Sequence, residues 1–239
     1  MQKYPVQREK NVLVTGGTRG IGAAVVKEFL ELKNKVYLTG TSKLENCNVN
    51  YLQADFSNLS SIAFLKEKVA KLNIDIIVNN AGINKIGNFE NYSSEDFLKL
   101  HQVNVLAPFE LCKAVIPNMK KRNWGRIVNI SSIFGKISKE YRAAYSSTKF
   151  ALDGMTIALA AELAQFGILA NCVSPGFVDT ELTHQILGDD GIRDLSKQIP
   201  MKRLGTPQEI AKFILWLSSE ENTYLTGQNI AIDGGFSRV

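Results

Sequence analysis

Cysteine and histidine are scarce in this sequence, and their scarcity excludes several kinds of site. The chain has three cysteines and two histidines among 239 residues. Cys47, Cys112 and Cys172 lie far apart, with no C-x-x-C pair and no histidine partner nearby. We therefore expect no disulfide framework and no metal site, and we expect the thiols to be reduced.

Long apolar runs and concentrated basic runs are absent as well. No stretch approaches the roughly 20 apolar residues that a membrane-spanning helix requires, and the charges of Met1–Lys10 have no apolar run behind them. We expect a soluble, cytoplasmic protein without a membrane partner. The net charge of +5 suits an anionic ligand, but it is spread along the chain, so nucleic-acid binding is not expected.

Apolar residues, by contrast, are abundant and form alternating strand-length and helix-length segments. They make up 45% of the chain. The alternation predicts an α/β protein with one domain over residues 1–239, in which helices cover both faces of a doubly wound parallel sheet. Strands are expected at Asn11–Val14, Lys35–Thr39, Val49–Ala54, Ile74–Asn79, Arg126–Ser131, Ile168–Ser174 and Asn229–Ile232, and helices at Ala23–Leu30, Leu59–Leu72, Ser94–Lys121, Ala143–Phe166 and Pro207–Ser218.

One connection does not fit this alternation. Thr41–Asn48, between the second and third expected strands, is too short to hold a full crossover helix. Either a helix is missing there, or the two strands pair in another way.

Glycines cluster where the first strand meets the first helix, in the segment Thr15–Gly22. Glycine lets the backbone turn tightly and approach a ligand, and the free amides that open a helix attract phosphate. We interpret the segment as a dinucleotide site, although a glycine-rich turn without a ligand has the same composition. The expected contacts are Gly16, Thr18, Arg19, Gly20, Ile21 and Gly22.

The end of the second strand indicates which dinucleotide is bound. NAD-specific enzymes usually carry an acidic residue there, about twenty residues past the glycine turn, for the ribose 2′-hydroxyl. Gly40 takes that place here and leaves room for a 2′-phosphate, while Thr41 and Ser42 offer hydroxyls and Arg19 offers a guanidinium. The pattern predicts NADPH. The alternative is that Arg19 is a solvated surface charge and Thr41-Ser42 is a plain turn.

Two further segments follow strand ends on the same side of the sheet. Asp55, with Phe56 after it, is placed to accept a hydrogen bond from the adenine amino group, or alternatively to cap the next helix. Asn80, Ala81 and Gly82 place small and amide side chains beside the nucleotide, or form an ordinary turn.

The residues suited to catalysis follow the fifth strand. Ser132 ends that strand, and thirteen residues later Tyr145 begins a Tyr-x-x-x-Lys pattern whose lysine, Lys149, shares its helix face. An ammonium beside a phenol lowers the pKa of the phenol, so we expect Tyr145 to exchange a proton near neutral pH. Ser132 is placed to donate a hydrogen bond to the same substrate oxygen. Each group alone has an ordinary structural explanation, but together with the glycine turn they indicate an enzyme.

In these motifs the chain closely resembles the short-chain dehydrogenase/reductase family, and within it the bacterial 3-oxoacyl-[acyl-carrier-protein] reductases. The resemblance extends from Asn11 to Phe236. It rests on T-G-x-x-x-G-x-G at Thr15–Gly22, Asn79–Gly82, Asn104, Ser132, Tyr145-x-x-x-Lys149, Pro175-Gly176 and Asp233–Gly235.

The resemblance implies a Rossmann-type fold and a role for each catalytic residue. Tyr145 would be the general acid in ketone reduction, with hydride coming from the nicotinamide. Lys149 would tune Tyr145 and hold the nicotinamide ribose. Ser132 would polarise the carbonyl, and Asn104 would anchor a water that relays protons to Lys149.

The resemblance also implies how the nicotinamide and the substrate are covered. Val178 and Thr180 would hold the carboxamide, and Glu181–Pro200 would form a mobile lid. A homotetramer is implied, assembled through the two long helices and the C-terminal strand.

Departures from the family pattern leave the substrate open. Lys120–Arg122 and Arg126 form a basic cluster of the kind that docks acyl carrier protein at the active-site mouth, but Phe166 replaces a basic residue that often precedes Gly167-Ile168. The leading hypothesis is an NADPH-dependent reductase of 3-oxoacyl thioesters. The alternatives are an oxidoreductase of a sugar-like or other small ketone or alcohol, and a nucleotide-sensing protein without catalysis.

Overall fold

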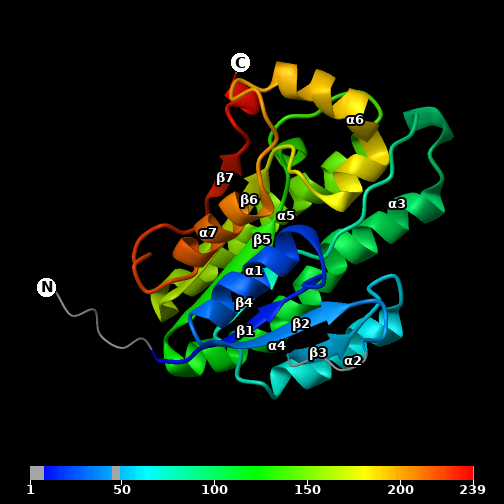
Figure 1. Cartoon of the computed structure of the whole chain (residues 1–239). Coiled ribbons are helices and arrows are strands. Elements are labelled where there is room, and N and C mark those ends of the chain that lie inside the picture. Colours follow the sequence, from blue (N-terminus) through cyan, green and yellow to red (C-terminus); the bar gives the residue numbers. More distant parts are fainter. Residues whose placement is uncertain (1–7, 45–48, 239) are drawn as a thin grey trace, which may run out of the picture.

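A parallel sheet lies between two helical layers in the computed structural model, which describes residues 8–44 and 49–238 (Figure 1). The described residues form a seven-stranded sheet in the order β3-β2-β1-β4-β5-β6-β7. The strands are β1 (Asn11–Val14), β2 (Lys35–Gly40), β3 (Asn50–Gln53), β4 (Ile76–Asn79), β5 (Gly125–Ile130), β6 (Ile168–Pro175) and β7 (Asn229–Ile232). The helices are α1 (Gly20–Glu31), α2 (Leu59–Ala70), α3 (Ser94–His101), α4 (Ala107–Arg122), α5 (Ala143–Leu163), α6 (Glu181–Gln198) and α7 (Pro207–Leu217).

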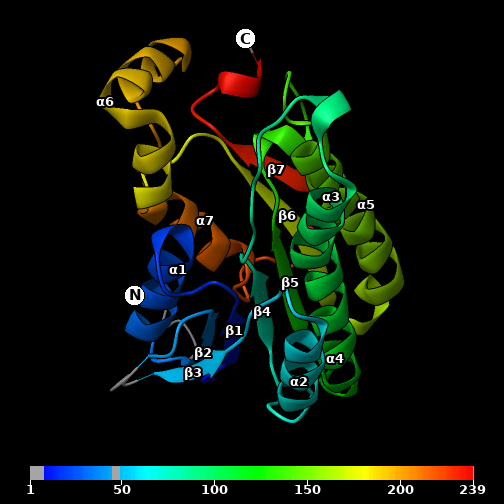
Figure 2. The same cartoon turned by 90° about the vertical axis from the view of Figure 1, so that its right-hand side faces the viewer.

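Successive strand residues face opposite helical layers. Leu13 and Ile77 pack in the core formed with α2, α4 and α5, whereas their neighbours Val12 and Val78 pack in the core formed with α1 and α7. Figure 2 shows the two layers on opposite sides of the sheet. Strands buried on both faces need apolar residues at every position, which is why they appear in the sequence as continuous apolar runs. The predicted doubly wound α/β sheet is confirmed.

The order of the strands reverses at β1, which has β2 on one side and β4 on the other. In a sheet of this kind, the crossover helices leave a crevice outside the carboxyl ends of the strands at the reversal point. The glycine segment Thr15–Gly22 follows β1 directly, and Asn80–Gly82 follows β4. The fold therefore brings both predicted nucleotide segments to one crevice.

The expected continuous helix Ser94–Lys121 is divided. α3 leads into a π-helical turn, Gln102–Leu106, and α4 continues from it to Arg122. Pro108 supplies a physical reason, because it has no N–H to donate to the carbonyl of Asn104 four residues earlier. Asn104 lies at the centre of the π turn.

The short connection between β2 and β3 joins parallel neighbours, with Tyr37 opposite Asn50. The alternative that these strands pair in another way is therefore wrong. The part of the connection that the structure describes, Thr41–Leu44, is not helical, and β3 holds it directly. The Gln53 amide donates to the Thr41 carbonyl at 3.0 Å, and the Tyr51 hydroxyl donates to the Ser42 carbonyl.

Two of the cysteines, Cys112 and Cys172, are free and buried, while Cys47 falls outside the described residues. Residues 8–44 and 49–238 contain no group of three or more His, Cys, Asp or Glu side chains suited to a metal ion. In the same residues, no helix is both long enough and apolar enough to span a membrane.

Candidate active site

A cavity of about 450 Å³ opens beyond the carboxyl ends of β4, β5 and β6 and is lined by three of the four residues predicted for catalysis, Ser132, Tyr145 and Lys149. Ser132 follows β5, and Tyr145 and Lys149 lie on the first two turns of α5. Asn80 and Gly82 line the same cavity from the end of β4. The fold therefore brings the serine, the tyrosine, the lysine and the nucleotide segment into one site.

Burial is the main influence on the pKa of the Tyr145 phenol. It raises the pKa of Tyr145, while a hydrogen bond with Ser132 and the charge of Arg142 act in the opposite direction. The predicted effect of Lys149 on this pKa is wrong in the structure. The Lys149 ammonium lies 5.5 Å from the centroid of the Tyr145 ring and donates to the Ile130 carbonyl at 2.9 Å. Burial is the largest influence on the pKa of Tyr145 and decides the direction of the shift.

Lys149 is itself buried, which lowers its pKa to about 8. Gly82 faces its ammonium, and a Cβ at residue 82 would stand 3.6 Å from Nζ and 3.3 Å from the Asn104 side-chain oxygen. A larger residue at this position would fill the space beside the ammonium. Glycine keeps that space available to a ligand.

Asn104 is fully buried behind the cavity and ties two segments together. Its Oδ1 accepts from the Ile83 N–H at 2.9 Å, and its Nδ2 donates to the Ile83 carbonyl at 2.9 Å and to the Thr148 hydroxyl at 3.1 Å. The segment after β4 is thereby fastened to α5 next to Lys149. The water relay remains a prediction, and no amide hydrogen of Asn104 is left over for it.

The glycine turn is locked to the end of β4 by Thr15 and Asn80. The Thr15 hydroxyl accepts from the N–H groups of Asn80 and Ala81, and the Asn80 amide donates to the carbonyls of Thr15 and Gly16, all at 3.0 Å. A Cβ at Gly22 would lie 2.2 Å from the Gly16 carbonyl oxygen. Only glycine permits this close approach, which leaves the first amides of α1 facing the crevice.

The predicted 2′-phosphate residues Arg19, Thr41 and Ser42 are all exposed. Gly40 has a different role from the one expected. A Cβ there would lie 2.7 Å from Thr18 Cγ2 and 2.9 Å from the Tyr51 hydroxyl. The space beside Gly40 is therefore filled by the protein, and only the exposed residues remain to meet a phosphate.

Asp55 is exposed and does not cap a helix, so that alternative is wrong. Its Oδ1 accepts from the Ser57 N–H at 2.9 Å and from the Ser57 hydroxyl at 2.7 Å, and these bonds lower its pKa. Asn58 caps α2 instead, with its side chain accepting from Ser60 and Ser61. Phe56 is buried, and its carbonyl accepts from the Gln102 amide at 2.9 Å.

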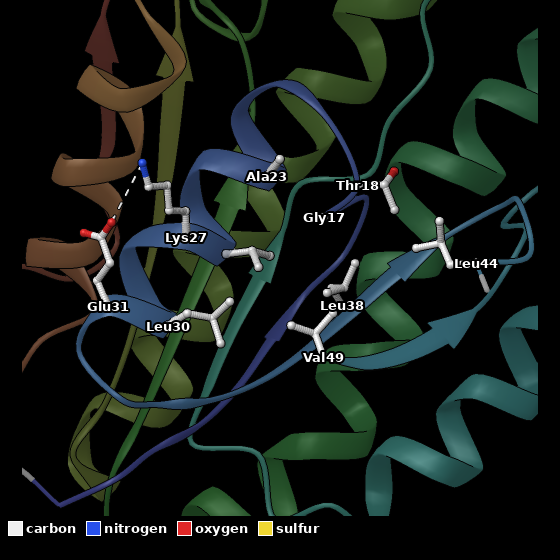
Figure 3. Close-up of a pocket in the computed structure, with 10 residues that line it drawn as sticks. Gly17, Thr18, Ala23, Lys27, Leu30, Glu31, Leu38, Leu44 and Val49 are labelled. Carbon is white, nitrogen blue, oxygen red and sulfur yellow. Dashed lines mark ion pairs between the residues drawn. The ribbon is translucent and has the colours of Figure 1, made fainter. Parts of the chain in front are cut away.

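A second cavity of about 530 Å³ lies between α1 and the β2–β3 edge (Figure 3). Leu30, Leu38, Leu44 and Val49 line it, and a Lys27–Glu31 ion pair of 3.8 Å stands on α1 beside them. A right-handed crossover helix between β2 and β3 would lie on this face, next to α1. The described part of the connection supplies no such helix.

Val178 and Thr180 connect the cavity to α6. The Thr180 hydroxyl caps α6 by accepting from the Thr183 N–H at 3.3 Å, and the Thr183 hydroxyl donates to the Val178 carbonyl at 2.6 Å. The predicted lid, Glu181–Pro200, is largely this helix, which is broken at Gly188 where φ is 62° and ψ is 177°. Thr183 and Leu187 line the cavity, so α6 covers the site, and its mobility remains a prediction.

Phe134, Arg142 and Phe177 are among the residues that line the cavity although the motifs did not single them out. Phe177 makes edge-on contacts with Phe134 at 6.2 Å and with Phe236 at 5.1 Å between ring centroids. Phe134 and Phe177 thus give the cavity an aromatic side next to Ser132, Tyr145 and Lys149. Their closeness to the catalytic motifs could have pointed to two of them from the sequence, because Phe134 lies two residues after Ser132 and Arg142 lies three residues before Tyr145.

The basic cluster is not at the mouth of this cavity, so that prediction is wrong for the single chain. Arg126 is the second residue of β5, at the amino end of the strand and away from the cavity, where it is buried and donates to the carbonyls of Gly125, Gly167 and Asn222. Arg122 pairs with Asp75 at 3.2 Å. Both guanidiniums are occupied in holding the fold together.

The chain is similar to known reductases over nearly its whole length. The family described as enoyl-(acyl carrier protein) reductase matches residues 16–237. A 3-oxoacyl-[acyl-carrier-protein] reductase of Aquifex aeolicus is 37% identical, over 93% of this chain and 95% of the relative.

Solved structures agree with these relatives. ElxO with NADP bound is 33% identical, with a TM-score of 0.87 over 96% of this chain and 99% of that one. An aldohexose dehydrogenase of Thermoplasma acidophilum is 30% identical, with a TM-score of 0.89 over 96% of this chain and 94% of that one. The chain therefore belongs to the short-chain dehydrogenase/reductase family.

Proposed function

We propose that the chain is an NADPH-dependent reductase of ketones. The observation that carries the proposal is the cavity in which Ser132, Tyr145 and Lys149 lie beside the glycine turn. The cofactor supplies the hydride when it is bound. Tyr145 donates the proton to the ketone oxygen, Ser132 donates a hydrogen bond to that oxygen, and Lys149 holds the nicotinamide ribose.

The residues present fit this cofactor along the whole crevice. The locked glycine turn and the N-terminus of α1 suit the pyrophosphate, and the exposed Arg19 suits an additional phosphate. The structurally related ElxO is described with NADP bound. The proposed contacts are Gly16, Thr18, Arg19, Gly20, Ile21, Gly22, Thr41, Ser42, Asp55, Phe56, Asn80, Ala81, Gly82, Tyr145, Lys149, Val178 and Thr180.

The substrate proposed first is a 3-oxoacyl thioester, with acyl carrier protein as the partner that presents it. The Aquifex aeolicus reductase and other relatives named as 3-oxoacyl-[acyl-carrier-protein] reductases support this choice. The test compares NADPH oxidation with an acetoacetyl thioester against a panel of free ketones and keto-sugars. A strong preference for the free ketones would reject the thioester assignment.

A sugar-like or other small ketone is the second candidate substrate. Arg122 and Arg126 are bound within the fold, so the cavity mouth lacks the basic cluster expected for a carrier protein. Phe166, which stands where the family often has a basic residue, instead places its ring 4.6 Å from the Lys120 ammonium. Both observations favour a substrate that is not bound to a carrier protein. The related aldohexose dehydrogenase supports the same reading. The substrate panel separates the two candidates directly.

Assembly and location complete the proposal. We expect a homotetramer, consistent with the apolar side chains that α3, α4 and α5 expose. We expect the protein to work in the cytoplasm, where its buried free thiols stay reduced.

A further inference from the structure

Arg142 brings a positive charge into the active-site cavity, and no carboxylate of the described residues is paired with it. It is half-buried and lines the cavity with Ser132, Tyr145 and Lys149. Its Nε is fully buried and has no hydrogen-bond partner. Across residues 8–44 and 49–238, no carboxylate pairs with the guanidinium, and the titratable side chain that acts on its pKa is that of Tyr145.

The contact that the guanidinium does make leaves its donors free. Its central carbon lies 5.2 Å from the centroid of the Phe134 ring. A ring face attracts a cation, but it does not replace the oxygen acceptor that the buried Nε–H lacks. Burial also lowers the pKa of Arg142 from its ordinary value. A guanidinium in this state binds a ligand oxygen strongly, because such an oxygen supplies the missing acceptor.

Arg122 provides a contrast within the same fold. Its Nε also lacks a hydrogen bond, yet the Asp75 carboxylate lies 3.2 Å away and balances its charge. Arg122 stands at the amino edge of the sheet, away from the cavity. Of these two arginines, the one without a carboxylate beside it lines the active-site cavity.

We propose that Arg142 is a specificity-determining residue that binds a second oxygen of the substrate, a carbonyl or carboxylate oxygen on the carbon chain beside the reacting ketone. The proposal rests on the ketone reduction proposed above. Arg142 precedes Tyr145 by three residues, about one helical turn. A substrate whose ketone oxygen lies at Tyr145 and Ser132 can therefore place its neighbouring polar group at Arg142. Thioesters of 3-oxo acids and free 3-oxo acids both carry such an oxygen, whereas a plain ketone does not.

The test measures three substrates with three proteins. The substrates are an acetoacetyl thioester, acetoacetate and butanone, which lacks the second oxygen. The proteins are the wild type, Arg142→Met, which keeps a long side chain but removes the charge and the donors, and Lys139→Met, which removes an equal charge from an exposed position outside the cavity.

Arg142→Met is expected to lower kcat/KM about tenfold or more for the thioester, for acetoacetate or for both, chiefly through KM. Reduction of butanone should be nearly unchanged, and Lys139→Met should resemble the wild type throughout. The substrate with the larger loss identifies the source of the oxygen. Equal losses on all three substrates would show that Arg142 acts through Tyr145 or the fold and would overturn the proposal. No loss on either oxygen-bearing substrate would overturn it as well.

A binding measurement separates this inference from the proposed function. If the wild type reduces no ketone, the proposed function fails. Acetoacetate is then titrated calorimetrically, with NADP⁺ present, into Tyr145→Phe and into the double variant Tyr145→Phe/Arg142→Met. Binding about tenfold weaker in the double variant supports the role of Arg142. Equal affinity, or no binding to either protein, rejects it.

Discussion

At the scale of single residues, Tyr145 and Lys149 show how burial changes the pKa values of two side chains whose closeness the sequence spacing predicts. The two residues share a helix face and one cavity. Burial disfavours the charged form of each, so it raises the pKa of Tyr145 and lowers that of Lys149 to about 8. Tyr145 is consequently protonated in the free protein. That is the state a proton donor in ketone reduction needs.

Replacing Tyr145 by Phe tests this role. We expect NADPH oxidation with the best ketone to fall by about 10²–10⁴-fold or more, because the general acid is lost. NADPH binding, measured by fluorescence titration, should persist. Tyr141→Phe is the matched control, since Tyr141 is exposed and lies outside the cavity. Retained turnover in Tyr145→Phe would remove the tyrosine from the mechanism, and a wild type that consumes no NADPH with any ketone would favour a nucleotide-sensing protein.

The low pKa of Lys149 predicts a pH dependence. Burial disfavours the ammonium and lowers this pKa to about 8, so the charge that would hold the ribose is present below that pH and lost above it. We expect kcat/KM for NADPH to be constant at lower pH and to fall as pH rises through about 8.

Lys149→Arg keeps its charge over the same range, because an arginine side chain has a pKa above about 12. Its profile should therefore lack the fall that the wild type shows near pH 8. The same fall in Lys149→Arg would assign the titration to another group.

At the scale of elements, the run from α3 to α4 shows where a periodic pattern misleads. Its apolar spacing predicts one helix, and the structure inserts the π turn Gln102–Leu106. The available signal was Pro108, which deprives the Asn104 carbonyl of its α-helical donor. The turn places Asn104 where it binds both Ile83 and Thr148.

Helix α7 is an element whose start was predicted from its residues and whose stability can be measured. The Thr206 hydroxyl accepts from the Glu209 N–H at 3.2 Å, and the Glu209 carboxylate accepts from the Thr206 N–H at 2.8 Å. Thr206→Ala should lower the free energy of unfolding by about 1 kcal/mol. Thermal denaturation should show a fall in Tm of about 2–4 °C.

Gln208→Ala, an exposed change in the first turn of α7, is the control for this variant. It should leave Tm close to that of the wild type, because Gln208 takes no part in the capping box. Equal Tm values for Thr206→Ala and the wild type would show that the cap does not stabilise α7.

At the scale of the whole molecule, one helical layer exposes apolar side chains that a free surface does not require. α3, the π turn, α4 and α5 lie together on one side of the sheet (Figure 2). Their exposed apolar residues are Phe97, Leu98, Leu106, Phe109, Phe150 and Ile157. A surface of this kind is typical of an interface between subunits.

The predicted homotetramer can be tested on α5. Phe150 and Ile157 are two turns apart on this helix, and they are 47% and 53% exposed. Phe150→Glu combined with Ile157→Glu should convert the tetramer to smaller species in sedimentation velocity, because charge would be buried in the interface. Leu59→Glu on α2, where the leucine is 59% exposed, should leave the tetramer intact. A wild type that sediments as a monomer would contradict the prediction.

The sequence by itself determined the fold class, the glycine turn and the Ser132, Tyr145 and Lys149 group. These follow from local spacing, and the connectivity of a parallel sheet carries strand ends to one edge. Only the tertiary structure decided that burial sets both pKa shifts, that Arg126 is used inside the fold, and that Arg142 lines the cavity with a buried Nε that no acceptor of the described residues reaches. Burial and pairing depend on groups far apart in the chain, and no short motif records which of them meet.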